Sequence, residues 1–221
     1  GITCWAEHFD EDSTDVLQIE DSISEKVAAA LLPKLTRDEQ RQLSKRGTDS
    51  SEAFEAYLRG RYYWSSYTEI GLAKALDCYK KAIALDPDYA LAYTGLADYY
   101  NWLGVFGVRP FAETSAAAKQ YAAKAVELDS TSAEAYSALG FATVCHDFDW
   151  AVAEGQHRRS IEINPNYATG HHWYAFHLVM EGRFDEGIEQ MLRTRELDPI
   201  SPSVLQAVGW CYYQARRFDE S

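Results

Sequence analysis

Small and apolar residues recur at helical spacing most clearly in residues 168–201, a stretch of 34 positions. Positions 4, 7, 8 and 11 of this stretch follow the i, i+3, i+4, i+7 pattern of one helix face. They are His171, Tyr174, Ala175 and Leu178. A second helix is predicted after the turn at Gly182, with Pro199 at its end. The pattern therefore predicts two helices joined by a tight turn.

The same spacing can be placed over most of the chain, in residues 53–89, 90–132, 133–167 and 168–201, with a truncated unit at 202–221. A helix–turn–helix unit of 34 residues is the tetratricopeptide (TPR) period. The expected fold is all-α: a right-handed TPR superhelical solenoid of about four and a half repeats.

Small residues at fixed repeat positions have a physical cause. Position 8 is where the two helices of a repeat approach most closely, and it is Gly60, Ala97, Gly140, Ala175 and Gly209 in the five units. Positions 20 and 27 are small because the second helix lies between two neighbours. One unit cannot bury both faces by itself, so stacking is needed to build a continuous core.

Residues 1–46 are predicted to form a strand at 2–9 followed by two helices, the remnant of an upstream α/β domain, and residues 47–52 a linker. An isolated strand cannot satisfy its own N–H and C=O groups. Its partner strands are therefore expected either upstream or in a second copy of the chain. The last unit stops at Ser221, halfway through a repeat. Both ends thus suggest a piece of a longer protein.

Several segments resemble a known bacterial arrangement. Residues 4–31 resemble the last strand and helix of the TolB-like α/β domain that precedes TPR arrays in bacterial winged-helix regulators, adenylate cyclases and serine/threonine kinases. Residues 55–64, 147–151 and 164–175 are similar to segments of those arrays. The resemblance covers nearly the whole chain and implies a sensory or scaffolding segment. It supplies no catalytic residue, because the kinase glycine-rich loop, catalytic loop and metal-binding signatures are absent.

The net charge of −13 disfavours binding of this segment to nucleic acid or to anionic membrane. No apolar run is long enough to span a membrane. The four Cys, at 4, 78, 145 and 211, stand singly, and those at 78, 145 and 211 are predicted to be small apolar side chains within helices. We expect a cytoplasmic location, with the sensor portion of a periplasmic protein as the alternative.

Helix positions 2, 5, 9, 12 and 13 of a TPR repeat point into the concave face. We predict an aromatic and mixed groove for an apolar or aromatic peptide, or for a helix of the protein itself. The alternative for any one ring is that it belongs only to the core between repeats. The predicted partner-binding residues are Tyr57, Arg61, Trp64, Asp98, Asn101, Trp102, Phe141, His172, Phe176, Met180, Gln206, Trp210 and Tyr213.

No catalytic residue, metal ligand or cofactor is predicted. His171 and His172 diverge by about 100° on a helix, and His172 and His177 are five residues apart, so no pair shares a face at i+4. These histidines are expected to be packed or at the surface. No carboxylate pairs with a nucleophile and base at helical spacing.

The insertion at 103–111, LGVFGVRPF, is apolar and lacks the ending of a phosphate loop. We expect it to be covered, either by folding back on the array or by a partner. The leading hypothesis is a non-enzymatic protein- or peptide-binding module. Two alternatives remain: a small-molecule sensor between the second and third repeats that uses this loop, and a self-assembly module that forms a homodimer through the N-terminal strand or the open C-terminal repeat.

Overall fold

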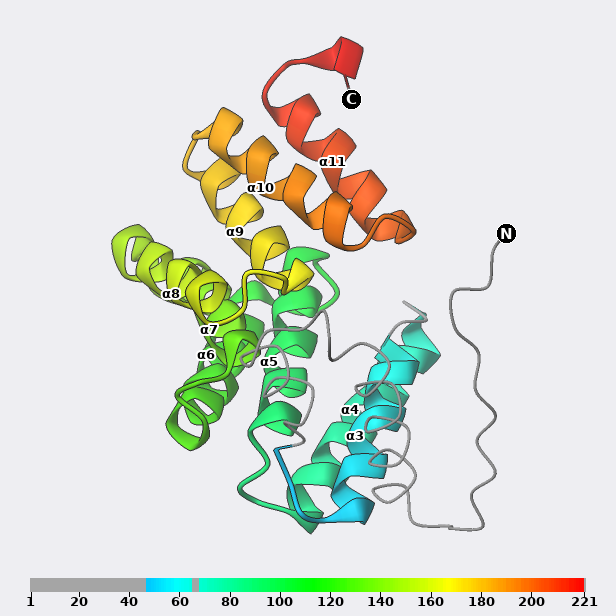
Figure 1. Ribbon diagram of the computed structural model, residues 1–221. Coiled ribbons are helices and arrows are strands. Elements are labelled where there is room, and N and C mark those ends of the chain that lie inside the picture. Colours follow the sequence, from blue (N-terminus) through cyan, green and yellow to red (C-terminus); the bar gives the residue numbers. More distant parts are fainter. Residues whose placement is uncertain (1–46, 65–67, 221) are drawn as a thin grey trace, which may run out of the picture.

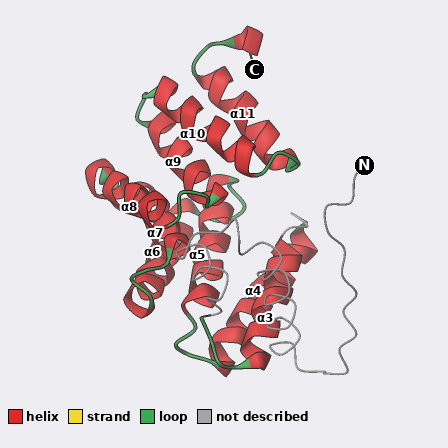
Figure 2. Ribbon diagram, viewed as in Figure 1, coloured by secondary structure: helices red, strands yellow, loops and turns green. Residues whose placement is uncertain are grey.

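The computed structural model describes residues 47–64 and 68–220, and this part of the chain is helical and without strands (Figure 2). The predicted strand at 2–9 and the two helices before residue 46 lie outside the described residues. The described helices are α3 (Ser51–Trp64), α4 (Glu69–Leu85), α5 (Ala90–Val105), α6 (Phe111–Leu128), α7 (Ala133–Asp147), α8 (Trp150–Ile163), α9 (Ala168–Met180), α10 (Phe184–Leu197) and α11 (Pro202–Gln214), with a short 3₁₀ turn, η2 (Phe218–Glu220).

The helices pack in consecutive pairs: α3 with α4, α5 with α6, α7 with α8, and α9 with α10. The pairs stack in order from α3 and α4 at one end to α11 at the other (Figure 1). Within the described residues, the first helices α3, α5, α7, α9 and α11 also contact one another in succession, whereas the second helices make at most marginal contact with each other. The first helices therefore form the inner row of a curved array, as the 34-residue pattern predicts.

Side-chain caps set the starts of several helices. The hydroxyl groups of Thr68 and Ser132 accept hydrogen bonds from Gly71 N and Ala135 N, each at 3.1 Å, and the Asp149 carboxylate accepts one from Val152 N. These bonds satisfy amides that have no partner inside the helix. The Ser50 hydroxyl accepts from Ala53 N, so α3 begins at Ser51, two residues before the predicted first repeat.

Glycine is required where Tyr79 of α4 lies between two inner helices. A Cβ atom at Gly60 would lie 2.5 Å from the Tyr79 ring, and one at Gly95 would lie 2.7 Å from it. Such distances are shorter than any normal carbon contact. A Cβ atom at Gly140 would similarly lie 2.8 Å from the ring of His157. The close helix crossings predicted at Gly60 and Gly140 are confirmed.

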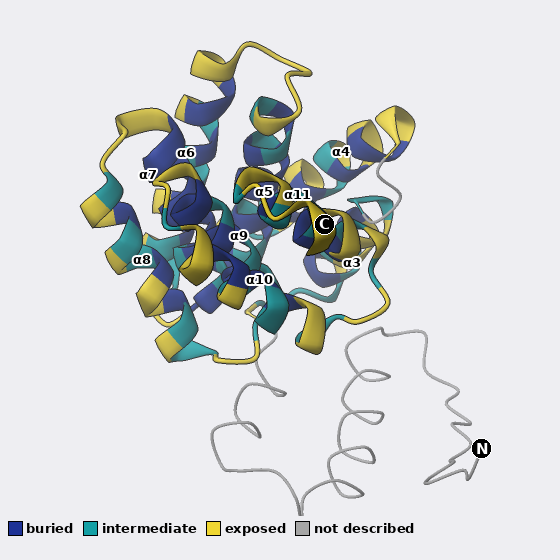
Figure 3. Cartoon of the chain, turned by 90° about the horizontal axis from the view of Figure 1, so that it is seen from above, coloured by how far each residue is buried: buried dark blue, intermediate teal, exposed yellow. Residues whose placement is uncertain are grey.

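Alanine fills the layers between helix pairs. Ala75, Ala82, Ala97, Ala122 and Ala153 are fully buried, as are their counterparts in the other pairs. Buried positions lie on the sides of the helices that face one another, and exposed positions lie outside (Figure 3). Of the described cysteines, Cys145 and Cys211 are buried and Cys78 is half-buried, and all three are free thiols. No described helix is long and apolar enough to cross a bilayer.

Candidate functional site

The predicted partner-binding residues differ widely in accessibility. Asp98, Asn101 and Phe141 are buried. Six rings of the inner row are half-buried: Tyr57, Trp64, Trp102, His172, Phe176 and Trp210. Exposed are Arg61, Met180, Gln206 and Tyr213. Phe141 is therefore core between repeats, the alternative that the sequence left open for each ring.

One stretch of the inner row is a continuous series of rings, here called the aromatic ladder: Phe141, Trp173, His172, Phe176 and Trp210. The ring centroids of Phe141 and Trp173 are 4.2 Å apart, and the stacked rings of Phe176 and Trp210 are 4.5 Å apart. His172 stacks on Phe176 at 5.0 Å. The ladder joins α7, α9 and α11 through ring contacts of favourable geometry.

Two properties of the ladder were not evident from the sequence. Trp173 is buried beside Phe141, although its repeat position was not expected to face this side. Burial also lowers the pKa of His172 to about 4. Its imidazole is therefore neutral at physiological pH, so the ladder carries no charge and its surface is apolar.

The inner row between α3 and α9 has a different character. Here five polar side chains lie within electrostatic range of one another, and we call them the polar cluster: Tyr57, Arg61, Asp98, Glu134 and Tyr167. They come from α3, α5, the start of α7 and the turn before α9. The sequence prediction included the first three and missed Glu134 and Tyr167. Glu134 is at position 2 of the third repeat, an inward position, so the repeat pattern contained a signal for it.

The electrostatics of the polar cluster centre on Asp98. Burial raises the pKa of its carboxyl group to about 7, an effect that Arg61 opposes and Glu134 reinforces. Burial likewise raises the pKa values of Tyr57 and Tyr167, so both phenols stay protonated. This part of the groove thus holds the Arg61 guanidinium beside a carboxyl group, that of Asp98, which titrates near neutrality.

The apolar loop between α5 and α6 does not fold back on the array. Leu103 is buried, but Val105, Phe106, Val108 and Phe111 are all exposed. The first alternative, that the loop folds back on the array, is therefore wrong for these four side chains, and cover by a partner stays a prediction. The ring centroid of Phe106 lies 4.6 Å from that of Trp102. The bond from Val108 N to Leu103 O holds the loop close to the end of α5.

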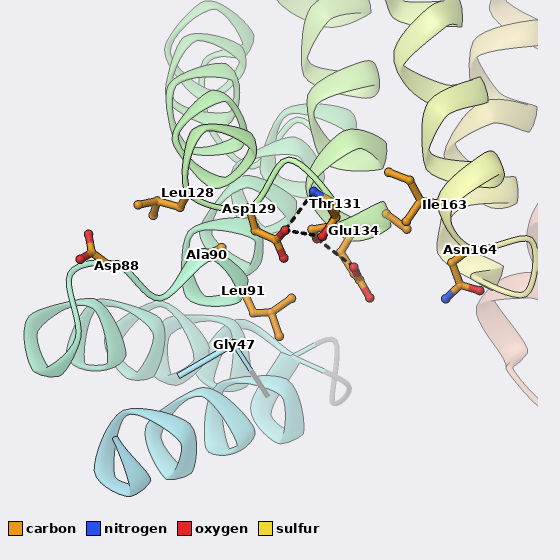
Figure 4. A pocket seen from close by; sticks show the side chains of 12 residues that line it. Gly47, Asp88, Ala90, Leu91, Leu128, Asp129, Thr131, Glu134, Ile163 and Asn164 are labelled. Carbon is orange, nitrogen blue, oxygen red and sulfur yellow. Dashed lines mark hydrogen bonds between the residues drawn. The ribbon is translucent and has the colours of Figure 1, made fainter. Parts of the chain in front are cut away.

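A pocket of about 320 Å³ opens at the opposite end of α5 and α6, among the turns that connect successive pairs (Figure 4). Its lining includes Leu91, Leu128, Asp129, Glu134 and Asn164. None of the predicted partner-binding residues and none of the residues of the 103–111 loop line it. The geometry thus allows a small-molecule site between the second and third pairs, but such a site would not use the loop as predicted. Glu134 belongs both to this pocket and to the polar cluster.

The three histidines considered as metal ligands pack separately. His171 contacts Gln190 Oε1 at 2.7 Å and the Pro165 carbonyl at 3.0 Å, and His177 is buried against the ring of His157. Within residues 47–64 and 68–220, no group of three or more His, Cys, Asp or Glu side chains is placed to hold a metal ion. The histidines of this region act in packing.

A charged network lies on the side of α8 that faces α9 and α10. Glu154 accepts a hydrogen bond from the Tyr174 hydroxyl at 2.8 Å and pairs with Arg158 and Arg183 at 2.9 and 3.1 Å. These bonds outweigh burial and hold the pKa of Glu154 at about 2. Every member has a partner, so this network joins α8 to α9 and α10 and offers no free group for chemistry.

Paired helices with small residues at each crossing and a contiguous inner row define a TPR-like helical repeat protein. In agreement, the structure of the TPR protein TTC0263 from Thermus thermophilus superposes with a TM-score of 0.61 over 76% of this chain and 85% of that one, at 17% identity. At this identity the likeness concerns the fold alone. No protein-family profile matches the chain.

Two similarities in sequence point to bacterial regulators. The chain is 25% identical over 173 residues to the transcriptional regulator HilA of Salmonella typhimurium, covering 78% of this chain and 31% of HilA. It is 26% identical over 110 residues to putative adenylate cyclase 3 of Rhizobium meliloti, covering 47% of this chain and 19% of that protein. The chain thus spans less than a third of the length of each of these two relatives.

Proposed function

We propose that this chain is a non-enzymatic interaction module of a larger bacterial signalling or transcription-regulatory protein. It binds a protein or peptide, or the effector domain of its own protein, along the inner row of helices. The observation that carries the proposal is the set of half-buried rings on four of the inner helices: Trp64 on α3, Trp102 on α5, Phe176 on α9 and Trp210 on α11. Large rings that are partly exposed on one continuous face are the side chains that most often anchor binding partners.

The regulatory context rests on the two sequence similarities. HilA is a transcriptional regulator, and the second relative is a putative adenylate cyclase, yet both match the same kind of helical segment. A segment shared by proteins with different outputs is better suited to binding than to catalysis. The acidic net charge of −13 disfavours nucleic acid as the partner of this segment. A cytoplasmic location fits this role and is part of the proposal.

Site-specific photo-crosslinking within the full-length protein tests the proposal. Met180 follows Phe176 by four residues and therefore shares its face of α9, and it is 44% exposed. Val152 on α8, a second helix, is 50% exposed and provides the matched control. A benzophenone amino acid at position 180 should form a defined adduct in cells, with a partner or with the effector domain, whereas the same group at position 152 should not.

Mass spectrometry of the adduct then identifies the partner. Replacing Phe176 and Trp210 together by alanine should abolish the adduct at position 180. Adducts of equal yield from both positions, or an adduct that survives loss of both rings, would count against partner binding on the inner row.

A small-molecule sensor is the second candidate, and the pocket of about 320 Å³ is what favours it. That volume lies at the lower end of the range for small-ligand sites. Thermal-shift screening against metabolites tests it. A hit whose stabilisation disappears on replacing Leu128 with Trp, which fills the pocket, would support sensing, and no stabilising metabolite would argue against it.

A further inference from the structure

The polar cluster contains a buried carboxyl group without a described partner. Asp98 on α5 is only 8% exposed, and among the described residues its side chain has neither a hydrogen bond nor an ion pair within 4.0 Å. Burying a carboxylate that accepts no hydrogen bond destabilises the folded chain. Folding alone does not account for an aspartate at this position.

A second buried acceptor lies one helical turn further along α5. Asn101 is 4% exposed and donates a hydrogen bond through Nδ2 to the Ala138 carbonyl of α7 at 3.2 Å. That bond fixes the orientation of the amide, and within the described part of the chain its Oδ1 atom has no hydrogen-bond partner. Because Asp98 and Asn101 are three residues apart, they lie on the same side of α5. This side of the helix therefore carries two acceptors to which no described residue donates a hydrogen bond.

The groups around Asp98 indicate what kind of donor fits. Glu134 contributes a second negative charge from α7, and Arg61 contributes a positive charge from α3. Arg61 is exposed, and among the described residues it has no ion pair within 4.0 Å with either acid. The rings of Tyr57 and Tyr167 are near enough to interact electrostatically with both acids. Phenol faces beside carboxylates are well suited to a cationic head group.

We propose that the polar cluster receives the ammonium or guanidinium head of a lysine or arginine side chain of the partner peptide, held between Asp98 and Glu134. This inference rests on the proposed function, since it names the chemistry of the partner that binds the inner row. The net charge of −13 complements a basic segment and would speed its association. The aromatic ladder would bind the neighbouring apolar side chains of the same peptide.

Selection from a random peptide library displayed on phage, with the 221-residue chain as bait, tests two claims separately: that the chain binds a peptide, and that the polar cluster receives a basic side chain of that peptide. We expect peptides with Lys or Arg enriched at one position beside aromatic or aliphatic residues. The same selection on Asp98→Asn, Glu134→Gln double-variant bait should still yield apolar peptides but lose the basic position. Peptides without a basic position, or with an acidic one, would overturn the inference and leave peptide binding standing. A bait that selects no peptide would overturn the proposed function as well.

Fluorescence anisotropy with one selected peptide measures the effect of each acid. Asp98→Asn and Glu134→Gln should each weaken binding at least about tenfold, and raised salt should weaken binding to the native chain. Glu113→Gln is the matched control, because Glu113 is an exposed acid of α6, outside the inner row. Equal losses for Glu113 and Asp98 would show only a general charge effect and would overturn the assigned contact. Spermidine that displaces the peptide at equimolar concentration would overturn the peptide side chain as the ligand and point to a free polyamine instead.

The pH profile of the same measurement distinguishes a direct contact from a structural role. The pKa of Asp98 is raised to about 7 by burial, so affinity for a cation should rise from about pH 6 to about pH 8 as the carboxyl group ionises. Arg61 and Glu134 are the charged groups that face it, and the raised pKa values of Tyr57, Tyr79 and Tyr167 keep those phenols neutral in this range. Asp98→Asn should flatten the profile, and an unchanged profile in that variant would overturn the contact.

Discussion

The aromatic ladder and the polar cluster occupy the same row of helices but differ in polarity. In the ladder each ring contacts the next, Phe176 stacks on Trp210, and burial keeps His172 neutral; its Trp173 Nε1 atom is buried without an acceptor among the described residues. In the polar cluster Asp98 is only 8% exposed and its carboxyl group accepts no hydrogen bond from the described residues. Beside the cluster, the Oδ1 atom of Asn101 is buried without a donor among the same residues. The ladder therefore stabilises the array, whereas the cluster reduces its stability. Unsatisfied buried polar groups of this kind are commoner at functional sites than elsewhere.

The largest expected change in stability comes from removing the buried Phe141 ring of the aromatic ladder. Phe141→Ala should lower the free energy of unfolding by about 3–5 kcal/mol, because Phe141 is 1% exposed and its removal leaves a cavity between α7 and α9. Phe148→Ala, about two helical turns further along the chain, is the matched control, since Phe148 is 66% exposed and should cost less than about 1 kcal/mol. Chemical denaturation measures both. Similar losses for the two variants would show that the ladder is not a stabilising element.

The next effect tests the packing beneath the polar cluster. Gly95→Ala should destabilise by about 1–3 kcal/mol, because the added Cβ atom would lie 2.7 Å from the Tyr79 ring. Gly155→Ala in the interior of α8 meets nothing within 4 Å and should instead stabilise by about 0.5–1 kcal/mol. If Gly95 lies as close to the Tyr79 ring as the structure shows, the midpoint of thermal unfolding should fall for Gly95→Ala and rise for Gly155→Ala. A Gly95→Ala variant as stable as the native chain would mean that Tyr79 moves away at little cost.

The sequence predicted the paired helices of the described region because small residues recur at the same positions of each repeat, and Gly60 and Gly140 lie against the rings of Tyr79 and His157 as that pattern requires. It could not predict which inward residues stay accessible. Phe141 and Trp210 occupy similar inward positions, yet only Trp210 is half-buried. That difference depends on which rings the neighbouring helix supplies, here Trp173, and a repeat pattern does not contain this information.

The sequence placed Arg61 and Asp98 in the groove but did not show that Glu134 joins them. Asp98, Glu134 and Arg61 are far apart along the chain, and only the stacking of α3, α5 and α7 brings them into electrostatic range. The prediction that the apolar loop at 103–111 folds back on the array was wrong for a related reason. Its composition predicted cover, but the short bonded turn at Val108 holds Phe106 and Phe111 at the surface. Composition shows that an apolar side chain favours burial, whereas the backbone geometry determines whether that side chain is buried.

A third effect concerns the loss of folding stability at low pH. The buried rings of His157 and His177 lie beside the aromatic ladder with their centroids 5.3 Å apart. Burial, reinforced by His177, lowers the pKa of His157 to about 3. The unfolded chain takes up this proton below about pH 6.5, so stability is fully present above that pH and falls towards pH 3 by up to about 1.4 kcal/mol per pH unit. His157→Leu should unfold less steeply with acid than the native chain between about pH 6 and pH 4.

Denaturant titrations of both proteins across that range test this third effect, with about pH 7.5 as the reference at which the histidine is neutral in either state. Identical acid slopes for native chain and variant would assign the loss of stability to carboxyl groups rather than to the buried imidazole.

The smallest effect has the opposite sign and separates the two regions most directly. The pKa of Asp98, about 7 in the folded chain, is raised above its unfolded value near 3.8, so its contribution to stability is lost as pH rises between those values. Asp98→Asn removes that loss and should stabilise the chain by about 1 kcal/mol at about pH 8, with little effect at about pH 3, where the carboxyl group is largely protonated in both states. Thermal unfolding at the two pH values measures the difference. No substitution in the aromatic ladder is expected to raise stability. If Asp98→Asn is more stable at the higher pH and also binds its peptide less well, the role of Asp98 is in binding rather than in folding. Destabilisation at both pH values would instead make Asp98 a structural residue like Phe141.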